Sequence, residues 1–104
     1  MITTFLLLLV AHALCDYPLQ GDFLSRAKNP ASPVPGVPWV WAMAAHAAIH
    51  GGAVGLVTQS QTLGLCEFAA HAVIDYAKCR GWLTFSGDQW LHIVCKALWA
   101  GVKP

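Results

Sequence analysis

Four long apolar stretches, separated by short polar or proline-rich segments, predict four helices along the chain. The Lys28–Pro38 segment between the first two stretches contains four prolines and a glycine, which exclude regular structure. Polar residues in the Thr58–Thr62 segment and Gly81, a suitable helix C-cap, separate the others. The sequence therefore predicts an all-α fold, a four-helix antiparallel bundle in one domain over residues 1–104, with helices over about Ile2–Arg26, Trp39–Val57, Leu63–Arg80 and Ser86–Trp99.

The first helix contains a proline that disturbs its second half. Pro18 has no backbone N–H, so it removes one helical hydrogen bond and predicts a kink. Gly21 and Asp22 mark a candidate break just beyond it. We expect Asp22 to cap a short amphipathic helix there.

Histidines and aspartates recur four residues apart within these helices. Residues at positions i and i+4 of a helix lie on one face, one turn apart, so each pair can hold one ion between its side chains. All five histidines belong to such a pair, which makes this the strongest pattern in the sequence. The pairs are His12–Asp16, His46–His50, His71–Asp75 and Asp88–His92.

The composition favours a membrane protein. Hydrophobic residues make up 57% of the chain and charged residues 11%, and the mean hydropathy is +0.54. A soluble domain carries about 25% charged residues, so this chain has too few to cover a soluble surface. A net charge of +1 is too small to indicate a nucleic-acid partner. A soluble oligomer with an apolar interior stays open, as does a homo-oligomer in the membrane.

Lysines and arginines predict the orientation of the helices. Arg26 and Lys28 follow the first helix, and Lys78 and Arg80 end the third, whereas the turn after the second helix has no basic residue. Basic residues accumulate in cytoplasmic loops. We therefore expect several membrane-spanning helices, both termini outside, and the proline-rich loop in the cytoplasm.

Aspartates inside membrane helices need compensation. Each costs about 2.5–3.5 kcal/mol at a helix centre. A divalent metal neutralises them best, and zinc binds both imidazole nitrogen and carboxylate oxygen. Zinc is the metal we expect, as one ion or as two ions bridged by a carboxylate. The predicted ligands are His12, Asp16, His46, His50, His71, Asp75, Asp88 and His92.

Several of these residues have a simpler interpretation. Asp75 and Lys78 are predicted catalytic residues, with Lys78 stabilising negative charge, but they also fit a plain intrahelical ion pair. Asp88 could serve only as a helix cap. Glu67, one turn before His71, is favoured as a solvated residue near the outer surface, with a third ligand on this helix as the alternative.

Two glutamines lie next to the predicted ligands. Gln20 follows Asp16 by four residues, and Gln89 is adjacent to Asp88. We expect both to be hydrogen-bond partners of ligands rather than ligands themselves.

The segments HALCDYPLQ, HAAIH, HAVIDYAK and DQWLH together resemble a known family. It is the domain of unknown function 3307 family, small membrane proteins of bacteria and phages. The resemblance extends from His12 to about Val94, although HAAIH, with His46 and His50, matches less firmly. It implies a location in the bacterial inner membrane. The family is distantly similar to membrane-bound metal-dependent hydrolases, which also place His and Asp inside membrane helices.

The function predicted from these observations is metal-dependent hydrolysis within the membrane. The metal would activate a water that attacks a phosphoester or a lipid headgroup. Two alternatives stay open. The same side chains could form the path of a metal or proton carrier, or a metal could simply staple a membrane interaction protein that catalyses nothing.

Overall fold

The computed structural model describes all 104 residues and contains five helices and no strand. The all-helical prediction is therefore confirmed. The helices are α1 (Ile2–Asp16), α2 (Gly21–Ala27), α3 (Trp39–Thr58), α4 (Gln61–Cys79) and α5 (Phe85–Val102).

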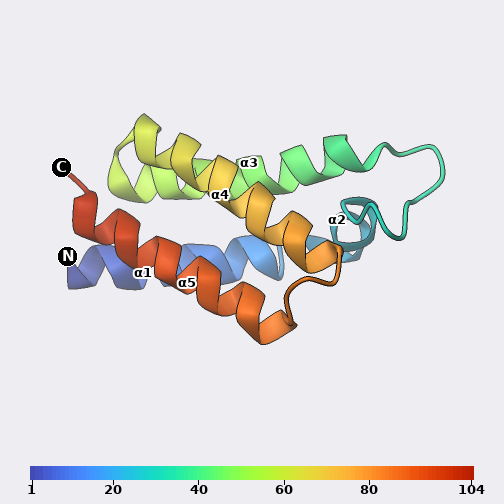
Figure 1. The fold of residues 1–104 in the computed structure, drawn as a ribbon. Helices are drawn as coiled ribbons and strands as arrows, with labels where there is room; N and C mark the ends of the chain where they lie inside the picture. The colour runs from blue at the N-terminus through green and yellow to red at the C-terminus, as the bar shows by residue number, and fades with distance from the viewer.

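The four long helices lie side by side around a shared interior (Figure 1). Helix α1 packs against α3 and α5, and α4 packs against the same two helices from the other side. Both termini lie at one end, and the short α2 lies at the other, where it contacts α3 (Figure 1). One end of the interior is thus bordered by the chain termini and the other by α2.

The expectation of one first helix reaching Arg26 is wrong. Helix α1 ends at Asp16, and the chain bends by 82° before α2. Pro18 has no N–H to donate, and the Leu14 carbonyl instead accepts a hydrogen bond from the Leu19 N–H, at 3.0 Å. Gly21 then adopts a φ of +66°, which a residue with a side chain rarely adopts.

The predicted cap of α2 is also wrong. Gln20 occupies the N-cap position, and it makes no side-chain cap hydrogen bond. Asp22 lies inside the first turn, where its carboxylate accepts a hydrogen bond from Arg26 Nε at 3.1 Å.

The ends of the later helices follow local signals. Gly81 has a φ of +80°, and the next N–H, that of Trp82, donates to the Ala77 carbonyl at 2.9 Å. These features are typical of a glycine C-cap, as predicted for α4. Helices α4 and α5 begin at side-chain caps: Ser60 accepts from the Leu63 N–H, and Thr84 accepts from the Gly87 N–H.

Helices α3 and α4 approach so closely that two glycines face each other. A Cβ atom added at Gly51 would lie 2.8 Å from the Gly64 carbonyl oxygen, and one at Gly64 would lie 2.8 Å from the Gly51 carbonyl oxygen. Only residues without a side chain fit this contact. This contact lies between the two helices that carry three of the five histidines, so it brings those histidines close to one another.

The interior contains more polar than apolar side chains. Eleven of the 22 buried residues are polar or charged. A small apolar cluster occupies the end near the termini, and the polar side chains fill the middle and the α2 end. The apolar cluster consists of Leu8, Val54, Leu63 and Ala100, with Phe5, Val57 and Trp99 packed against it.

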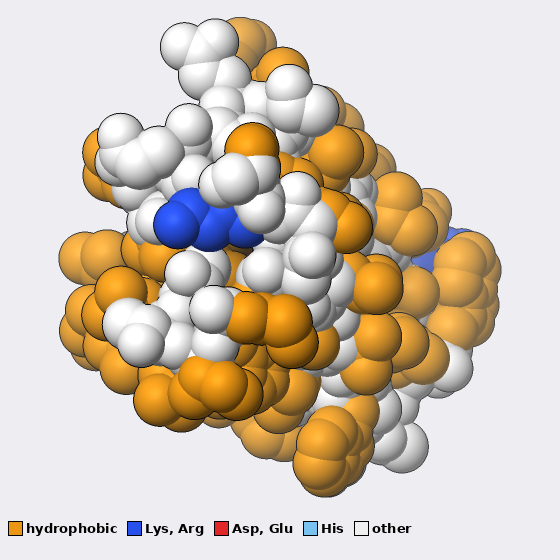
Figure 2. Space-filling view, turned by 90° about the vertical axis from the view of Figure 1, so that its left-hand side faces the viewer, with side chains coloured by type: hydrophobic (Ala, Val, Ile, Leu, Met, Phe, Trp, Pro, Cys, Tyr) orange, Lys and Arg blue, Asp and Glu red, His pale blue; other side chains and the backbone are white.

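Large hydrophobic side chains lie on the outside. Trp41, Leu56, Leu65 and Val73 each expose more than two thirds of their surface. Figure 2, which views the end that carries both termini, shows hydrophobic side chains over much of this surface, a few cationic atoms and no acidic ones. An apolar exterior around a polar interior reverses the usual arrangement of a soluble protein.

By length and composition, only α3 could cross a membrane as a single straight helix. The bent pair of α1 and α2 counts as a second candidate if it forms one span. By this measure the expected multi-pass arrangement is not supported, because the polar residues of α4 and α5 lower the mean hydropathy of these helices.

Candidate metal centre

Four predicted ligands from three helices bring their donor atoms together near the α2 end. Asp16 is the last residue of α1, His46 and His50 lie one turn apart on α3, and His71 lies on α4. Asp16 Oδ1 lies 3.2 Å from His46 Nε2, 3.1 Å from His50 Nε2 and 3.9 Å from His71 Nε2. We call these four residues the donor set; one donor atom of each lies within 4.8 Å of all the others.

The spacing of these atoms fits the coordination sphere of a small cation. Zinc binds imidazole nitrogen at about 2.0–2.1 Å, so two ligand atoms of a tetrahedral site lie about 3.3–3.4 Å apart. The distances from Asp16 Oδ1 to His46 Nε2 and His50 Nε2 are close to this value, and the distance to His71 Nε2 is about 0.5 Å longer. In addition, His46 Nε2 and His71 Nε2 approach to 3.1 Å, which is unfavourable unless a proton or a cation lies between their lone pairs.

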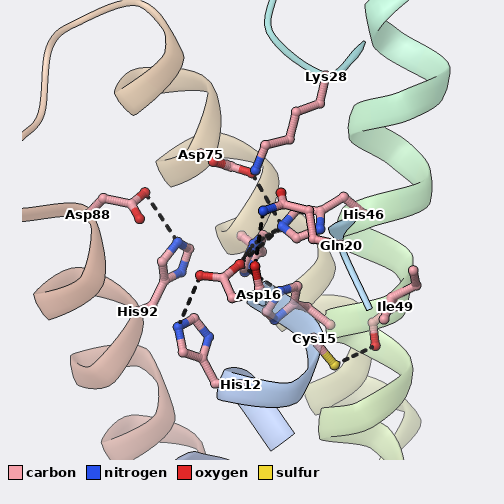
Figure 3. A network of polar contacts seen from close by, with 12 residues as sticks. His12, Cys15, Asp16, Gln20, Lys28, His46, Ile49, Asp75, Asp88 and His92 are labelled. Carbon is pink, nitrogen blue, oxygen red and sulfur yellow. Dashed lines mark hydrogen bonds and ion pairs between the residues drawn. The ribbon is translucent and has the colours of Figure 1, made fainter. Parts of the chain in front are cut away.

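Asp75 lies beside the donor set and is paired with a lysine. Its Oδ2 atom is 3.5 Å from His46 Nε2 and accepts a hydrogen bond from Lys28 Nζ (Figure 3). Both partners are buried, with exposed side-chain fractions of 6% for Lys28 and 4% for Asp75. Lys28 is the C-cap residue of α2, so this ion pair ties α2 to α4.

The structure does not bring Lys78 to this cluster. Its Nζ lies over the Phe85 ring, 5.2 Å from the centroid. The intrahelical pair of Asp75 with Lys78, which was the simpler interpretation of these two residues, is also not formed, because Asp75 pairs with Lys28. Lys28 lies 47 positions from Asp75, so no local pattern in the sequence indicated this pair.

The remaining predicted ligands line the α5 side of the interior. His12 Nε2 lies 3.4 Å from Asp16 Oδ2, and His92 Nε2 lies 3.3 Å from Asp88 Oδ1 (Figure 3). Asp88 is not the cap of α5, because Thr84 has that role. Asp88 Oδ1 and the Nδ1 atoms of His12 and His92 are buried without a hydrogen-bond partner. His12 and Asp88 belong to no compact group of donor atoms, whereas His92 forms a second one with Glu67 and His71, whose donor atoms lie within 4.8 Å of one another.

Gln89 connects the two sides of the cluster. Its amide nitrogen donates to Asp16 Oδ2 at 2.9 Å and to Asp88 Oδ2 at 3.1 Å. Its amide oxygen lies 3.2 Å from His12 Nε2. Gln20 donates to the Asp16 backbone carbonyl at 3.0 Å. Both glutamines are thus hydrogen-bond partners of residues predicted as ligands, as expected from the sequence.

Two buried charges were missed in the sequence. Glu67, expected to be solvated, is fully buried, and both of its oxygens lie 2.9 Å from Lys96 Nζ. Lys96 itself is 1% exposed. It follows His92 by four residues, and this continuation of the Asp88–His92 spacing could have placed it on the interior face.

Carboxylates outnumber lysines in the interior. Four carboxylates lie in it with two lysines, so the charges balance only with two protons on the imidazoles or with a bound cation. A buried charge without a partner is expensive. One divalent cation would cancel the excess, and the donor set is rich in the ligands that zinc prefers. The residues therefore fit a metal.

These features define a small all-helical protein with an interior rich in side chains that could bind a metal. The chain belongs to a family described as protein of unknown function (DUF3307), whose model matches residues 4–102. No curated protein and no solved structure matches the chain.

Proposed function

We propose that this protein is a membrane-embedded helical bundle that holds a divalent metal, zinc first, and hydrolyses a phosphoester or a lipid headgroup. The observation that carries the proposal is the convergence of three imidazole nitrogens and one carboxylate oxygen inside a bundle whose interior carboxylates outnumber its interior lysines. His46, His50, His71 and Asp16 would hold the metal. When bound, it would supply a Lewis acid and a water activated at neutral pH.

The apolar exterior supports a lipid environment. Helices of 18–20 residues, such as α3, α4 and α5, extend about 27–30 Å, close to the thickness of the hydrocarbon layer. Their charged residues lie mainly inside, so the mean hydropathy of α4 and α5 understates how apolar their outer faces are. This argument supports several spans rather than one.

Aromatic and basic residues support one orientation in the membrane. Trp39 packs on Tyr76, with ring centroids 5.5 Å apart, and Tyr76 packs on Trp82, at 5.9 Å. These rings lie near the α2 end, which also carries Arg26 and Arg80. Tryptophan and tyrosine concentrate at membrane interfaces, and basic residues at the cytoplasmic one. The candidate metal centre would therefore lie in the cytoplasmic half of the membrane.

Asp75 and Lys28 are the residues that we assign to catalysis. Asp75 lies beside the donor set but outside it, so its carboxylate is available to accept a proton from a water. Lys28 supplies a positive charge at the same place and would stabilise an anionic substrate group. The role expected for Lys78 is transferred to Lys28.

A closed metal site that only staples the helices is the second candidate. Structural zinc sites have four protein ligands, as this donor set does, whereas catalytic sites keep one position open. A groove of about 430 Å³ lies on α3 and α4, lined among others by Gly52, Leu65 and Phe68, and none of its lining residues belongs to the donor set.

The carrier alternative has less support, because the polar interior ends at the apolar cluster around Leu8.

Metal content tests the proposal. Protein purified in detergent with zinc should retain about one ion per chain, and Asp16→Asn should lose it. Asp22→Asn is the matched control, since it removes an equal charge from an exposed carboxylate. Wild-type protein that stays metal-free would refute the metal centre.

Cobalt substitution then separates the two candidates. Adding inorganic phosphate to the Co²⁺ protein should change its visible spectrum if a coordination position is open, as hydrolysis requires. Release of inorganic phosphate from vesicles that contain phosphatidic acid, a phosphomonoester lipid, should then fall in Asp75→Asn. An unchanged spectrum and no phosphate release would favour the stapling role.

A further inference from the structure

Glu67 makes an unusually complete set of contacts for a carboxylate inside α4. Its Oε1 atom accepts hydrogen bonds from Lys96 Nζ and from Trp99 Nε1, each at 2.9 Å. Its Oε2 atom accepts from Lys96 Nζ at 2.9 Å and lies 3.0 Å from His71 Nδ1. The side chain is fully buried, so no water competes for these positions.

We infer that Glu67 is a positioning residue that fixes the tautomer and the orientation of His71. This inference rests on the proposed metal centre, since it assigns His71 as the ligand that is held in place before the metal binds. An ionised carboxylate can only accept hydrogen bonds, so the proton of a neutral His71 must lie on Nδ1. Its Nε2 atom then carries a lone pair, directed at the donor set.

The geometry matches the arrangement found around metal-bound histidines. Such a histidine almost always donates its second ring N–H to a carboxylate, a carbonyl or a water, which fixes the ring and makes the ligand more basic. In His71 the two ring nitrogens have separate tasks. Nδ1 faces Glu67 at 3.0 Å, and Nε2 faces His46 Nε2 at 3.1 Å.

The other histidines differ from His71 in this respect. The Nδ1 atoms of His12, His46 and His92 are buried and have no hydrogen-bond partner. Their Nε2 atoms instead lie 3.2–3.4 Å from carboxylate oxygens of Asp16 or Asp88, so these contacts favour the proton on Nε2 in a neutral ring. Among these four rings, His71 is the one whose carboxylate contact leaves Nε2 free to bind a metal, which makes it the anchor of the centre.

Lys96 keeps Glu67 ionised. It is 1% exposed and contacts both carboxylate oxygens, so it is the counter-ion of Glu67. The pair lies next to Trp99, which packs against the apolar cluster. Lys96 thus acts through Glu67 and His71, whereas Lys28 lies at the opposite side of the donor set.

The tautomer of His71 in metal-free wild-type protein is the first test. Long-range ¹H–¹⁵N spectra of histidine-labelled protein in detergent, at a pH where the imidazoles are neutral, report which ring nitrogen carries the proton. We expect the Nδ1–H form for His71. The Nε2–H form would overturn the inference, and this measurement needs no variant.

Zinc affinity is the second test. Glu67→Gln keeps the shape of the side chain but removes the charge, and it should weaken Zn²⁺ binding about 10- to 100-fold in competition with a chelator. Asp22→Asn should leave the affinity unchanged. Equal affinities of the wild type and Glu67→Gln would contradict the inference.

The two tests separate this inference from the proposed function. Wild-type protein with an Nδ1–H His71 but no zinc binding would refute the metal centre and keep the orientation of His71 by Glu67. Zinc binding by a protein whose His71 carries its proton on Nε2 would support the metal centre and refute the orientation of His71 by Glu67. If Glu67→Gln fails to fold, the wild-type spectrum still decides.

Discussion

The contact between Gly51 and Gly64 gives a sharp test of how α3 and α4 pack. In Gly51→Ala, the new methyl group would lie 2.8 Å from the Gly64 carbonyl oxygen and 3.2 Å from Phe68 Cβ. Both neighbours belong to α4, and the carbonyl is backbone, so the two helices must separate to accept the methyl group. The neighbouring Gly52 provides a control, because a Cβ there meets nothing within 4 Å.

The expected magnitude follows from two opposing effects. Forcing an extra methyl group into a packed contact costs about 1–3 kcal/mol. Replacing glycine by alanine within a helix gains about 0.5–1 kcal/mol, and this gain applies to both variants. The difference in unfolding free energy between Gly51→Ala and Gly52→Ala is therefore the clash alone, about 1–3 kcal/mol. For a chain of this size, it corresponds to roughly 4–24 °C in Tm.

Thermal unfolding followed by circular dichroism in detergent measures this difference. Gly51→Ala should melt below Gly52→Ala, and Gly52→Ala should melt at or slightly above the wild type. Equal melting temperatures for the two variants would show that the helices do not approach at these glycines, and the reasoning from close packing would fail.

Three further predictions concern charge, metal and capping. Lys28→Met leaves Asp75 buried without its cation and should lower the free energy of unfolding by about 3–5 kcal/mol in chemical denaturation. Lys78→Met should lower it by less than about 1 kcal/mol, and similar losses in the two variants would argue against the assigned pairing. Removing zinc with a chelator should lower Tm, and zinc at 100 times its Kd should raise the free energy of unfolding again by about 2.7 kcal/mol. A Tm that does not change with zinc would argue against the metal centre. Ser60→Ala removes the acceptor for the Leu63 N–H and should cost about 1 kcal/mol in the same unfolding assay, unless α4 begins elsewhere.

The sequence by itself determined which segments form helices and which residues share a face. The all-helical fold follows from apolar stretches bounded by Gly81 and by a proline-rich loop, and these signals are local. The spacing of four residues placed His12 with Asp16 and Asp88 with His92, and the structure has both pairs within 3.4 Å. A helical period fixes such neighbours without any tertiary contact.

The end of α1 was only partly determined. Pro18 and Gly21 predicted a disturbance, but not that the chain would turn by 82°. A proline removes one hydrogen bond in any helix. Whether the helix continues beyond the kink depends on what the following residues pack against, and α2 packs against α3.

Only the tertiary structure decided how the buried charges are paired. Asp75 has Lys78 one turn away on α4, yet it pairs with Lys28, 47 positions distant. Glu67 was expected in solvent and instead meets Lys96, 29 positions distant. An exposed pair within one helix contributes little free energy, whereas a buried carboxylate must find a partner. The pairing therefore depends on which helices enclose each carboxylate, and the order of residues along one helix does not contain that information.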